Sequence, residues 1–226
     1  MESLHGRWYQ DACGTAFALE IIGERWSLLV VRELMLGGLR FSDIKRALPG
    51  ISSKVLAERL AGLETAGVLV KREAPPPTSA TIYELTEWGY HAEPAIQELG
   101  RWAARSACHD PSLPLSPVSL MISLRTMIDH RAAQELEADI GFEVAGQTFR
   151  ARLSKGIMPI GRGVLDGAQA VFRAQTAAPI AAFFYRKLPP QEIEGLELEG
   201  DLQLATRFGG LFSLPPRIDT RPSAAE

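Results

Sequence analysis

Basic residues gather in the stretch between Arg40 and Arg72. This stretch holds seven basic and three acidic residues, a local net charge of +4, whereas the whole chain has a net charge of −3. Arginine and lysine neutralise phosphates, and the counterions that are released supply much of the affinity of proteins for DNA. The stretch therefore marks where a nucleic acid could bind. A solvated helix face, which most runs of charge are, is the alternative interpretation.

The same stretch has the apolar spacing of two short helices. The apolar positions are Phe41, Ile44 and Leu48 in the first segment, and Leu56, Leu60 and Leu63 in the second. Pro49 and Gly50 should end the first helix, Ser52 suits the N-cap of the second, and Gly67 suits its left-handed end. Two helices joined by a tight turn predict a helix-turn-helix whose second helix enters the major groove. An ordinary packed helical hairpin has the same periodicity and stays possible.

Patterns that could support catalysis or metal binding are incomplete. His91-Ala92-Glu93 matches half of a zinc deaminase signature, but no P-C-x-x-C follows it. Cys108-His109-Asp110 could bind a metal, yet no second ligand pair accompanies it. Gly161-Arg162-Gly163 misses the dinucleotide-binding spacing, and G-x-S-x-G is absent. We therefore predict a protein that is not an enzyme and has no cofactor and no metal site.

Composition indicates two domains. The chain has 226 residues, of which 46% are hydrophobic and 23% charged, as in ordinary globular proteins. All four tryptophans precede residue 110, whereas seven of the nine phenylalanines follow it. The prolines of residues 109–117 predict a stiff linker. The predicted domains are therefore residues 1–108 and 118–222.

No targeting or membrane segment is expected. The most hydrophobic early stretch, residues 16–36, is interrupted by charged residues that would be costly in a bilayer. Two cysteines, Cys13 and Cys108, are too few for a disulfide framework and fit a reducing compartment. We expect a cytoplasmic protein that does not contact membranes.

The remaining elements of the first domain surround the two helices. Residues 12–22 and 24–36 read as two helices separated at Gly23. Residues 68–73 and 81–85 are rich in β-formers and predict a hairpin, which would be a wing after the recognition helix. Thr86 can cap a following helix over residues 87–106, which Pro94 should interrupt.

The motifs together resemble a known family. They are a cysteine opening the first helix, G-x-[RK]-W, R-F-S-D-[IL], L-P-G-I-S-x-x-x-L, R-L-x-x-L-x-x-x-G and Y-x-L-T-x-x-G, between about residues 10 and 106. The chain is thereby similar to the HxlR-type winged helix-turn-helix transcriptional regulators. The resemblance implies a homodimer, paired through its first helix and residues 87–106, that binds double-stranded DNA. Two recognition helices would then meet successive major grooves about 34 Å apart.

The resemblance also assigns roles to single residues. The side chains that match groove-facing positions are Ser53, Lys54, Ala57 and Glu58, and those placed for phosphates are Ser52 and Lys45 or Arg46. Arg59 would contact DNA or form an internal ion pair. The wing tip, residues 75–80, has no basic residue, so a minor-groove contact would fall to Lys71 and Arg72 at its base.

Cys13 matches the place where some members of the family sense electrophiles or oxidants. Such sensing needs an exposed thiol in positive surroundings, as at a helix N-terminus. A packed, unreactive cysteine at the dimer seam is the alternative.

The second domain reads as α+β. The expected strands are residues 118–124, 168–175 and 195–200, with a hairpin over 140–154 that turns at Ala145-Gly146; the expected helices are 131–137, 178–187 and 201–212. Its last third resembles sterol carrier protein-like domains, which implies a pocket for a hydrophobic or aromatic molecule. The candidate lining residues are Phe142, Phe149, Phe172, Phe183, Phe184, Phe208 and Phe212. Each of these rings could equally just fill the core.

The predicted fold is therefore α+β, a winged helix-turn-helix domain followed by a smaller mixed domain. The predicted function is a dimeric DNA-binding transcriptional regulator whose operator affinity changes with a hydrophobic or aromatic effector. The alternative is a carrier of lipids or aromatic compounds that uses the winged helix for dimerisation only.

Overall fold

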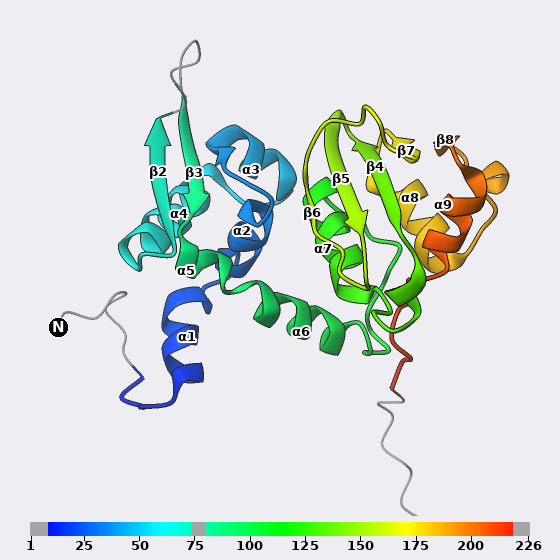
Figure 1. Ribbon diagram of the computed structural model, residues 1–226. Coiled ribbons are helices and arrows are strands. Elements are labelled where there is room, and N and C mark those ends of the chain that lie inside the picture. Colours follow the sequence, from blue (N-terminus) through cyan, green and yellow to red (C-terminus); the bar gives the residue numbers. More distant parts are fainter. Residues whose placement is uncertain (1–8, 74–79, 219–226) are drawn as a thin grey trace, which may run out of the picture. The chain divides into compact units, whose positions relative to one another are not determined.

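The computed structural model describes residues 9–73 and 80–218 (Figure 1). The chain divides into two compact units between Ile96 and Gln97. The segment 109–117, expected as the linker, lies within the second unit. The domain limits 1–108 and 118–222 remain a prediction.

The first unit is mostly helical and carries one small sheet. Its helices are α1 (Gly14–Ile22), α2 (Ser27–Leu34), α3 (Phe41–Ala47), α4 (Ser53–Thr65) and α5 (Glu87–Tyr90), and α6 (Glu93–Ala103) begins in it. Its strands are β1 (Leu39–Arg40), β2 (Leu69–Glu73) and β3 (Thr81–Leu85), in the antiparallel order β1-β3-β2. The β2–β3 hairpin directly follows α4, as the sequence predicts for a wing (Figure 1). The predicted tip of this wing is residues 75–80, and all of it except Ala80 lies outside the described residues.

The helix expected to be interrupted at Pro94 is interrupted a few residues earlier, between two separate helices. α5 ends at Tyr90, and α6 begins at Glu93, so Pro94 lies in the first turn of α6. A proline is tolerated there, because the first-turn amides of a helix have no partner within that helix. The predicted single helix over residues 87–106 is thus two helices, and Thr86 caps the first by accepting a hydrogen bond from the Gly89 amide at 3.0 Å.

The second unit combines one mixed sheet with helices. Its helices are α7 (Pro117–Met127), α8 (Ala177–Ala181) and α9 (Leu202–Gly209), with the 3₁₀ turns Ala132–Glu135 and Pro190–Glu192 and a π-helix, Ala182–Arg186. Its strands are β4 (Ala138–Val144), β5 (Gln147–Leu153), β6 (Ile160–Arg162), β7 (Ala170–Ala174) and β8 (Glu197–Gly200). The order is β6-β5-β4-β7-β8, with β4 and β7 parallel and the other neighbours antiparallel. The β4–β5 hairpin turns at Ala145-Gly146, as predicted.

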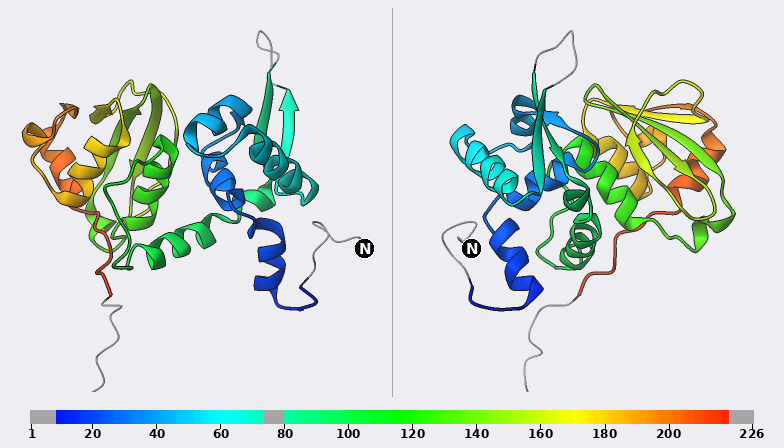
Figure 2. Two further views of the ribbon diagram at one scale, coloured as in Figure 1. Left: turned by 180° about the vertical axis from the view of Figure 1, so that it is seen from behind. Right: turned by 60° about the vertical axis from the view of Figure 1, so that its left-hand side comes forward.

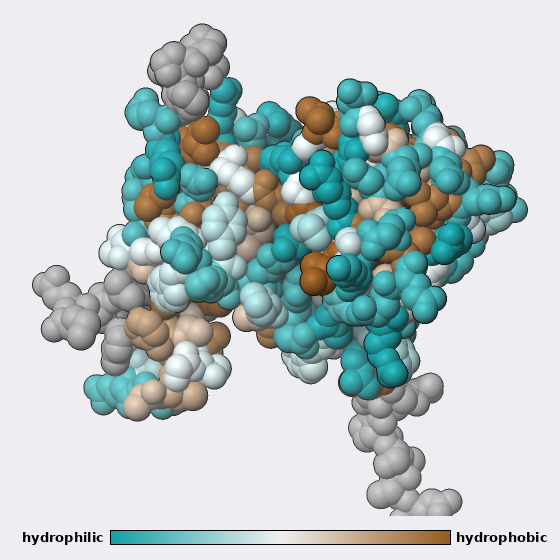
Figure 3. Space-filling view, viewed as in Figure 1, coloured by the Kyte–Doolittle hydropathy of each residue, from teal (hydrophilic) through white to brown (hydrophobic). Residues whose placement is uncertain are grey.

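The five-stranded sheet has one apolar and one polar face. Helices α7, α8 and α9 lie over one face (Figure 2, left), where the alternating residues Ile140, Phe142 and Val144 of β4 are fully buried. The opposite face carries charged side chains and is mostly hydrophilic at the surface (Figure 3). The edge strand β8 presents exposed glutamates, Glu197 and Glu199, and the other edge strand, β6, has three residues.

The strand expected at residues 118–124 is wrong, because this segment is the middle of α7. Ser116 caps α7 by accepting a hydrogen bond from the Ser119 amide at 2.9 Å, and Pro117 occupies its first position. The segment is mostly apolar and is buried on nearly all sides, and such a run does not distinguish a strand from a buried helix. The helix expected at residues 131–137 is only a 3₁₀ turn, and β6 was not predicted.

Candidate nucleic-acid interface

The apolar face of α4 holds this helix on the first unit. Leu56, Leu60 and Leu63 are at most 1% exposed, as their spacing predicts. Ile44 of α3 and Leu48 after it are also buried. Since these side chains are packed in the core, only the opposite side of α4 is available to a partner.

The turn before α4 has the geometry that its residues predict. Gly50 has φ +95°, in the region that glycine adopts without strain. Ser52 Oγ accepts a hydrogen bond from the Val55 amide at 3.1 Å and so caps the helix. Gly67 follows the other end of α4 with φ +75°. The start and end of α4 are therefore fixed by local contacts.

The outward side of α4 carries small and charged side chains. Ser53, Lys54, Ala57 and Glu58 are all exposed. Lys54 Nζ lies 4.0 Å from Glu58 Oε1, and 86% of the Lys54 side chain is exposed. A helix with such a surface can enter a DNA groove, because its backbone is not shielded by bulky side chains and its polar atoms can reach base edges.

Most other candidate cations are paired with nearby carboxylates. The pairs are Arg46 with Asp43 at 3.0 Å, Lys71 with Glu64 at 2.7 Å and Arg72 with Glu84 at 2.7 Å. The Glu64 carboxylate raises the pKa of Lys71 through a hydrogen bond and its charge. Exposed pairs of this kind contribute little to stability, so a phosphate could replace the carboxylate at small cost. Lys45 has no ion-pair partner among the described residues.

Arg59 differs from the other candidate cations. Its Nη2 lies 3.3 Å from Glu24 Oε2, and its Nε donates to the Arg25 carbonyl at 3.2 Å. Only 22% of its side chain is exposed. Of the two roles that the sequence left open for Arg59, the internal ion pair is present. Glu24 and Arg25 were not predicted as site residues. They belong to the G-x-[RK]-W motif, as G-E-R-W, and this motif was the sequence signal that could have identified them.

Arg40 is a further cation of the basic stretch, for which the sequence predicted no role. It is exposed, and it is the last residue of β1 and the residue directly before α3, the first helix of the helix-turn-helix. Its place in the basic stretch was the signal that could have identified it. We add Arg40 to the candidate phosphate-binding residues.

Cys13 lies at the start of α1 and is exposed. Hydrogen bonds from the Thr15 backbone, the Thr15 side chain and the Ala16 backbone lower the pKa of its thiol. A lower pKa increases the fraction of reactive thiolate at neutral pH. Cys108 is also exposed.

The seven candidate pocket phenylalanines are all buried, at most 6% exposed. Six of them are in ring contact with one another, with Phe184 in the centre; the ring centroids of Phe184 and Phe212 are 4.9 Å apart, and those of Phe172 and Phe183 are 5.0 Å apart. Phe149 lies instead beneath the Arg162 guanidinium, 5.2 Å from its ring centroid. The rings thus pack as a core cluster, and their role as a ligand pocket stays a prediction.

Two polar groups border this aromatic cluster. Tyr185 Oη and Ser123 Oγ are 2.6 Å apart, and burial raises the pKa of Tyr185. Lys187 has a left-handed backbone, φ +57°, and its ammonium donates to the carbonyls of Gly209, at 2.7 Å, and Phe212. Burial lowers the pKa of Lys187. Both groups are satisfied by contacts that hold the π-helix in place.

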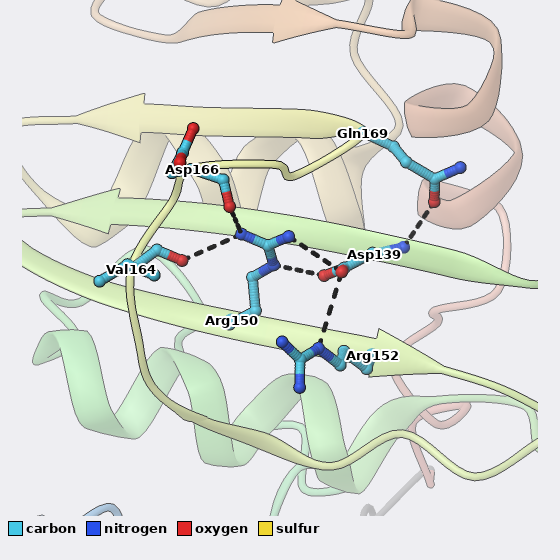
Figure 4. A network of polar contacts seen from close by, with 6 residues as sticks. All are labelled: Asp139, Arg150, Arg152, Val164, Asp166 and Gln169. Atoms are coloured by element: carbon cyan, nitrogen blue, oxygen red, sulfur yellow. Dashed lines mark hydrogen bonds and ion pairs between the residues drawn. The ribbon is translucent and has the colours of Figure 1, made fainter.

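The polar face of the second unit contains an arginine-centred network (Figure 4). Arg150 donates through Nε and Nη2 to the Asp139 carboxylate and through Nη1 to the carbonyls of Val164, at 3.0 Å, and Asp166, at 2.8 Å. Arg152 lies 3.6 Å from the same carboxylate. The Arg150 guanidinium holds the pKa of Asp139 below its usual value. This network attaches the 163–169 loop to the sheet.

Neither a metal-ligand cluster nor a membrane-spanning helix is found among the described residues. Within residues 9–73 and 80–218, no group of three His, Cys, Asp or Glu side chains could hold a metal ion. In the same residues no helix has the length and apolar character needed to cross a bilayer.

Comparisons with known proteins identify relatives of the first part of the chain. The family model described as HxlR-like helix-turn-helix matches residues 21–110. The HTH-type transcriptional regulator YvaP of Bacillus subtilis, itself uncharacterized, is 45% identical over 87 residues, which cover 38% of this chain and 80% of YvaP. YodB of the same species is 38% identical over 86 residues, covering 38% of this chain and 77% of YodB. YtfH of Escherichia coli is 31% identical over 97 residues, covering 43% of this chain and 77% of YtfH.

Among solved structures, the reduced form of YodB from B. subtilis has 35% identity and a TM-score of 0.39. The match covers 44% of this chain and 97% of that one.

Proposed function

Because this chain belongs to the HxlR-like helix-turn-helix family of transcriptional regulators, we propose that α4 is its recognition helix and reads operator DNA in the major groove. The relatives are transcriptional regulators and not enzymes. The observation that carries the proposal is the two-sided character of α4. Leucines anchor one side to the core, and the other side offers Ser53, Lys54, Ala57 and Glu58 to a partner.

The proposed contacts divide into two kinds. Ser53, Lys54, Ala57 and Glu58 face base edges, where lysine favours guanine, glutamate favours cytosine and alanine packs against a thymine methyl. Phosphate contacts come from Arg40, Lys45, Arg46 and Ser52, with Lys71 and Arg72 at the base of the wing. The carboxylates that now pair with these cations would be exchanged for phosphates on binding.

Selection from random-sequence DNA followed by gel-shift titration tests this proposal. The full-length protein should enrich one sequence and bind it tighter than unrelated DNA, with an affinity that falls as salt rises. Binding that ignores both sequence and salt would reject the role of α4.

We further propose that the regulator is a homodimer. Apolar side chains are exposed on α1, where Leu19 is 49% exposed, and on α6, where Trp102 is 73% exposed. A second copy covering these side chains would bury apolar area that is costly to leave in water. Sedimentation of the protein and of a Trp102→Glu variant tests this: the variant should be monomeric and should bind the operator more weakly.

For the second unit we propose an effector-binding role, as the aromatic cluster favours apolar ligands. Because six of its rings touch, a ligand would have to separate them or bind beside them. A typical coupling of about 1 to 3 kcal/mol would change operator affinity roughly 5- to 150-fold. Fatty acids and small aromatic compounds should be screened by thermal shift and then added to the operator titration. A compound that stabilises the protein but leaves operator affinity unchanged would favour a carrier over an effector domain.

Cys13 is proposed as a reactive thiol, on the basis of its exposure and lowered pKa. Cys108, which is also exposed, is the matched control. Mass spectrometry after mild oxidation or quinone treatment should find Cys13 modified before Cys108. An unmodified Cys13 would reject this role.

A further inference from the structure

Arg59 on α4 contacts the segment between α1 and α2, residues 23–26, which is called the corner below. Its guanidinium makes two contacts there, to the Glu24 carboxylate at 3.3 Å and to the Arg25 carbonyl at 3.2 Å. The second contact ends on a backbone atom, whose position is fixed by the fold and not by a flexible side chain. The direction of this hydrogen bond therefore constrains where the middle of α4 lies.

The corner that receives Arg59 has an unusual backbone. Trp26 has φ +82°, a left-handed conformation that is strained for a bulky residue. The Arg25 guanidinium lies over the Trp26 ring, 5.3 Å from its centroid. Such strain persists only where the surrounding contacts hold the residue in place. In this backbone conformation the Arg25 carbonyl points towards α4 and accepts the hydrogen bond from Arg59.

The same corner approaches the turn before α4. A Cβ atom placed on Gly50 would lie 3.7 Å from Cη2 of Trp26, which is ordinary van der Waals contact. The Trp26 ring thus lies beside the turn of the helix-turn-helix, and Arg59 joins the corner to the middle of α4. Leucine packing alone is non-directional and resists a small rotation of α4 weakly, whereas these contacts oppose it.

We propose that Arg59 is a positioning residue that sets the orientation of the recognition helix through Glu24 and the Arg25 carbonyl, and that it is not a DNA contact. The inference rests on the proposed role of α4 in DNA recognition. It predicts that breaking the Arg59–Glu24 pair from either side lowers affinity for the operator and leaves binding to unrelated DNA almost unchanged.

Glu24→Gln gives the decisive test, because the two possible roles of Arg59 predict opposite changes in the affinity for the operator. If Arg59 positions α4, Glu24→Gln should lower operator affinity about tenfold, the equivalent of one charge-assisted hydrogen bond. If Arg59 instead binds a phosphate, removing its competing carboxylate should raise affinity. Glu87→Gln, which removes one exposed acidic charge from the same unit, is the control for the change in net charge.

Arg59→Met and the double variant complete the experiment on the full-length protein. The operator found by selection and an unrelated duplex are titrated at several salt concentrations, at a temperature where circular dichroism shows every variant folded. We expect Arg59→Met to lose about tenfold in operator affinity without changing the salt slope, and the double variant to lose no more than either single variant. A lysine at position 59, in Arg59→Lys, should restore part of the affinity by keeping the contact with Glu24.

Three outcomes would overturn the inference while the unaltered protein still binds its operator. The first is tighter operator binding by Glu24→Gln. The second is a salt slope lowered by about 0.9 in Arg59→Met, which is the signature of one lost phosphate contact. The third is a lowered melting temperature of the Arg59→Met and Glu24→Gln variants with unchanged affinities for both DNAs. The last would make Arg59 merely structural. If the unaltered protein bound no DNA specifically, the proposed function itself would fail, and this inference with it.

Discussion

The two units of this protein use their arginines and lysines differently. In the helix-turn-helix unit, Lys54 and Arg46 have side chains 86% and 77% exposed, and each pairs with an acidic neighbour on its own helix. In the second unit, Arg150 is 11% exposed and gives its hydrogen bonds to one carboxylate and two backbone carbonyls. The first kind of cation can change partners, whereas the second kind is part of the fold.

Local charge alone therefore does not identify a nucleic-acid contact. Arg59 lies in the basic stretch and on the recognition helix, yet its burial and its bond to a backbone carbonyl resemble those of Arg150. Exposure and the type of partner atom therefore separate the two kinds better than position in the sequence. Four experiments test how the two units depend on these side chains.

The largest effect is expected for Arg150→Met. The substitution leaves the Asp139 carboxylate without its bidentate partner and releases the 163–169 loop, so the free energy of unfolding of the second unit should fall by about 2 to 3 kcal/mol. Hydrogen exchange of β4 and β5 amides measures this loss. Arg152→Met, which removes a more exposed and more distant cation from the same carboxylate, should cost less than about 0.5 kcal/mol. Equal losses in the two variants would contradict the comparison.

Lys54→Ala should change which DNA is preferred. Loss of a base-reading side chain should remove about 1 to 3 kcal/mol of discrimination at one operator position, with little effect on stability. Titration against operators that differ by single base pairs measures it. Arg46→Ala is the matched variant: it should weaken all sequences alike and lower the salt slope by about 0.9. A uniform loss in Lys54→Ala would assign Lys54 to phosphates.

Ser52→Ala should destabilise the start of α4. Removing the Oγ that accepts from the Val55 amide costs about 1 kcal/mol in typical helices, so the thermal midpoint of the first unit should fall. Ser53→Ala removes a hydroxyl one residue later without removing this cap. Calorimetry should find the loss only in the Ser52 variant.

The smallest part of the Arg150 effect is its dependence on pH, which appears only near and below about pH 4. Because Arg150 lowers the pKa of Asp139, the pair stabilises the folded state fully above about pH 4, the ordinary range of an aspartate. This stability is lost as the pH falls through the lowered pKa. When unfolding is followed from pH 7 to pH 2, the difference in stability between the unaltered protein and Arg150→Met should therefore shrink at the acid end, while the part due to the bonds from Arg150 to the Val164 and Asp166 carbonyls remains. Parallel curves would show that Asp139 does not couple to Arg150.

Sequence patterns predicted the helix-turn-helix unit well, because its elements have local causes. The leucine spacing of α4, its Ser52 cap and its Gly67 end all lie within one short stretch, and each was confirmed. α7 was missed because a helix buried on nearly all sides loses its amphipathic period. Its Ser116-Pro117 start carried the only local sign of a helix.

The partner of Arg59 could not be predicted from spacing. Glu24 precedes it by 35 positions, and only the packed fold brings the two side chains together. The phenylalanines of the second unit pose a related problem, since a core cluster and a pocket lining have the same pattern of apolar residues in sequence. Ring contacts, such as that of Phe184 with Phe212, emerge only in three dimensions.

The edges of the five-stranded sheet bear on how the protein behaves when concentrated. Unpaired strand edges are templates on which other chains can add strands and grow into fibrils. Here one edge is only three residues long, and the other, β8, sets Glu197 and Glu199 against any approaching copy. Electrostatic repulsion along β8 should therefore keep neighbouring molecules apart in a crowded cell, and neutralising these two glutamates should shorten the time before turbidity develops.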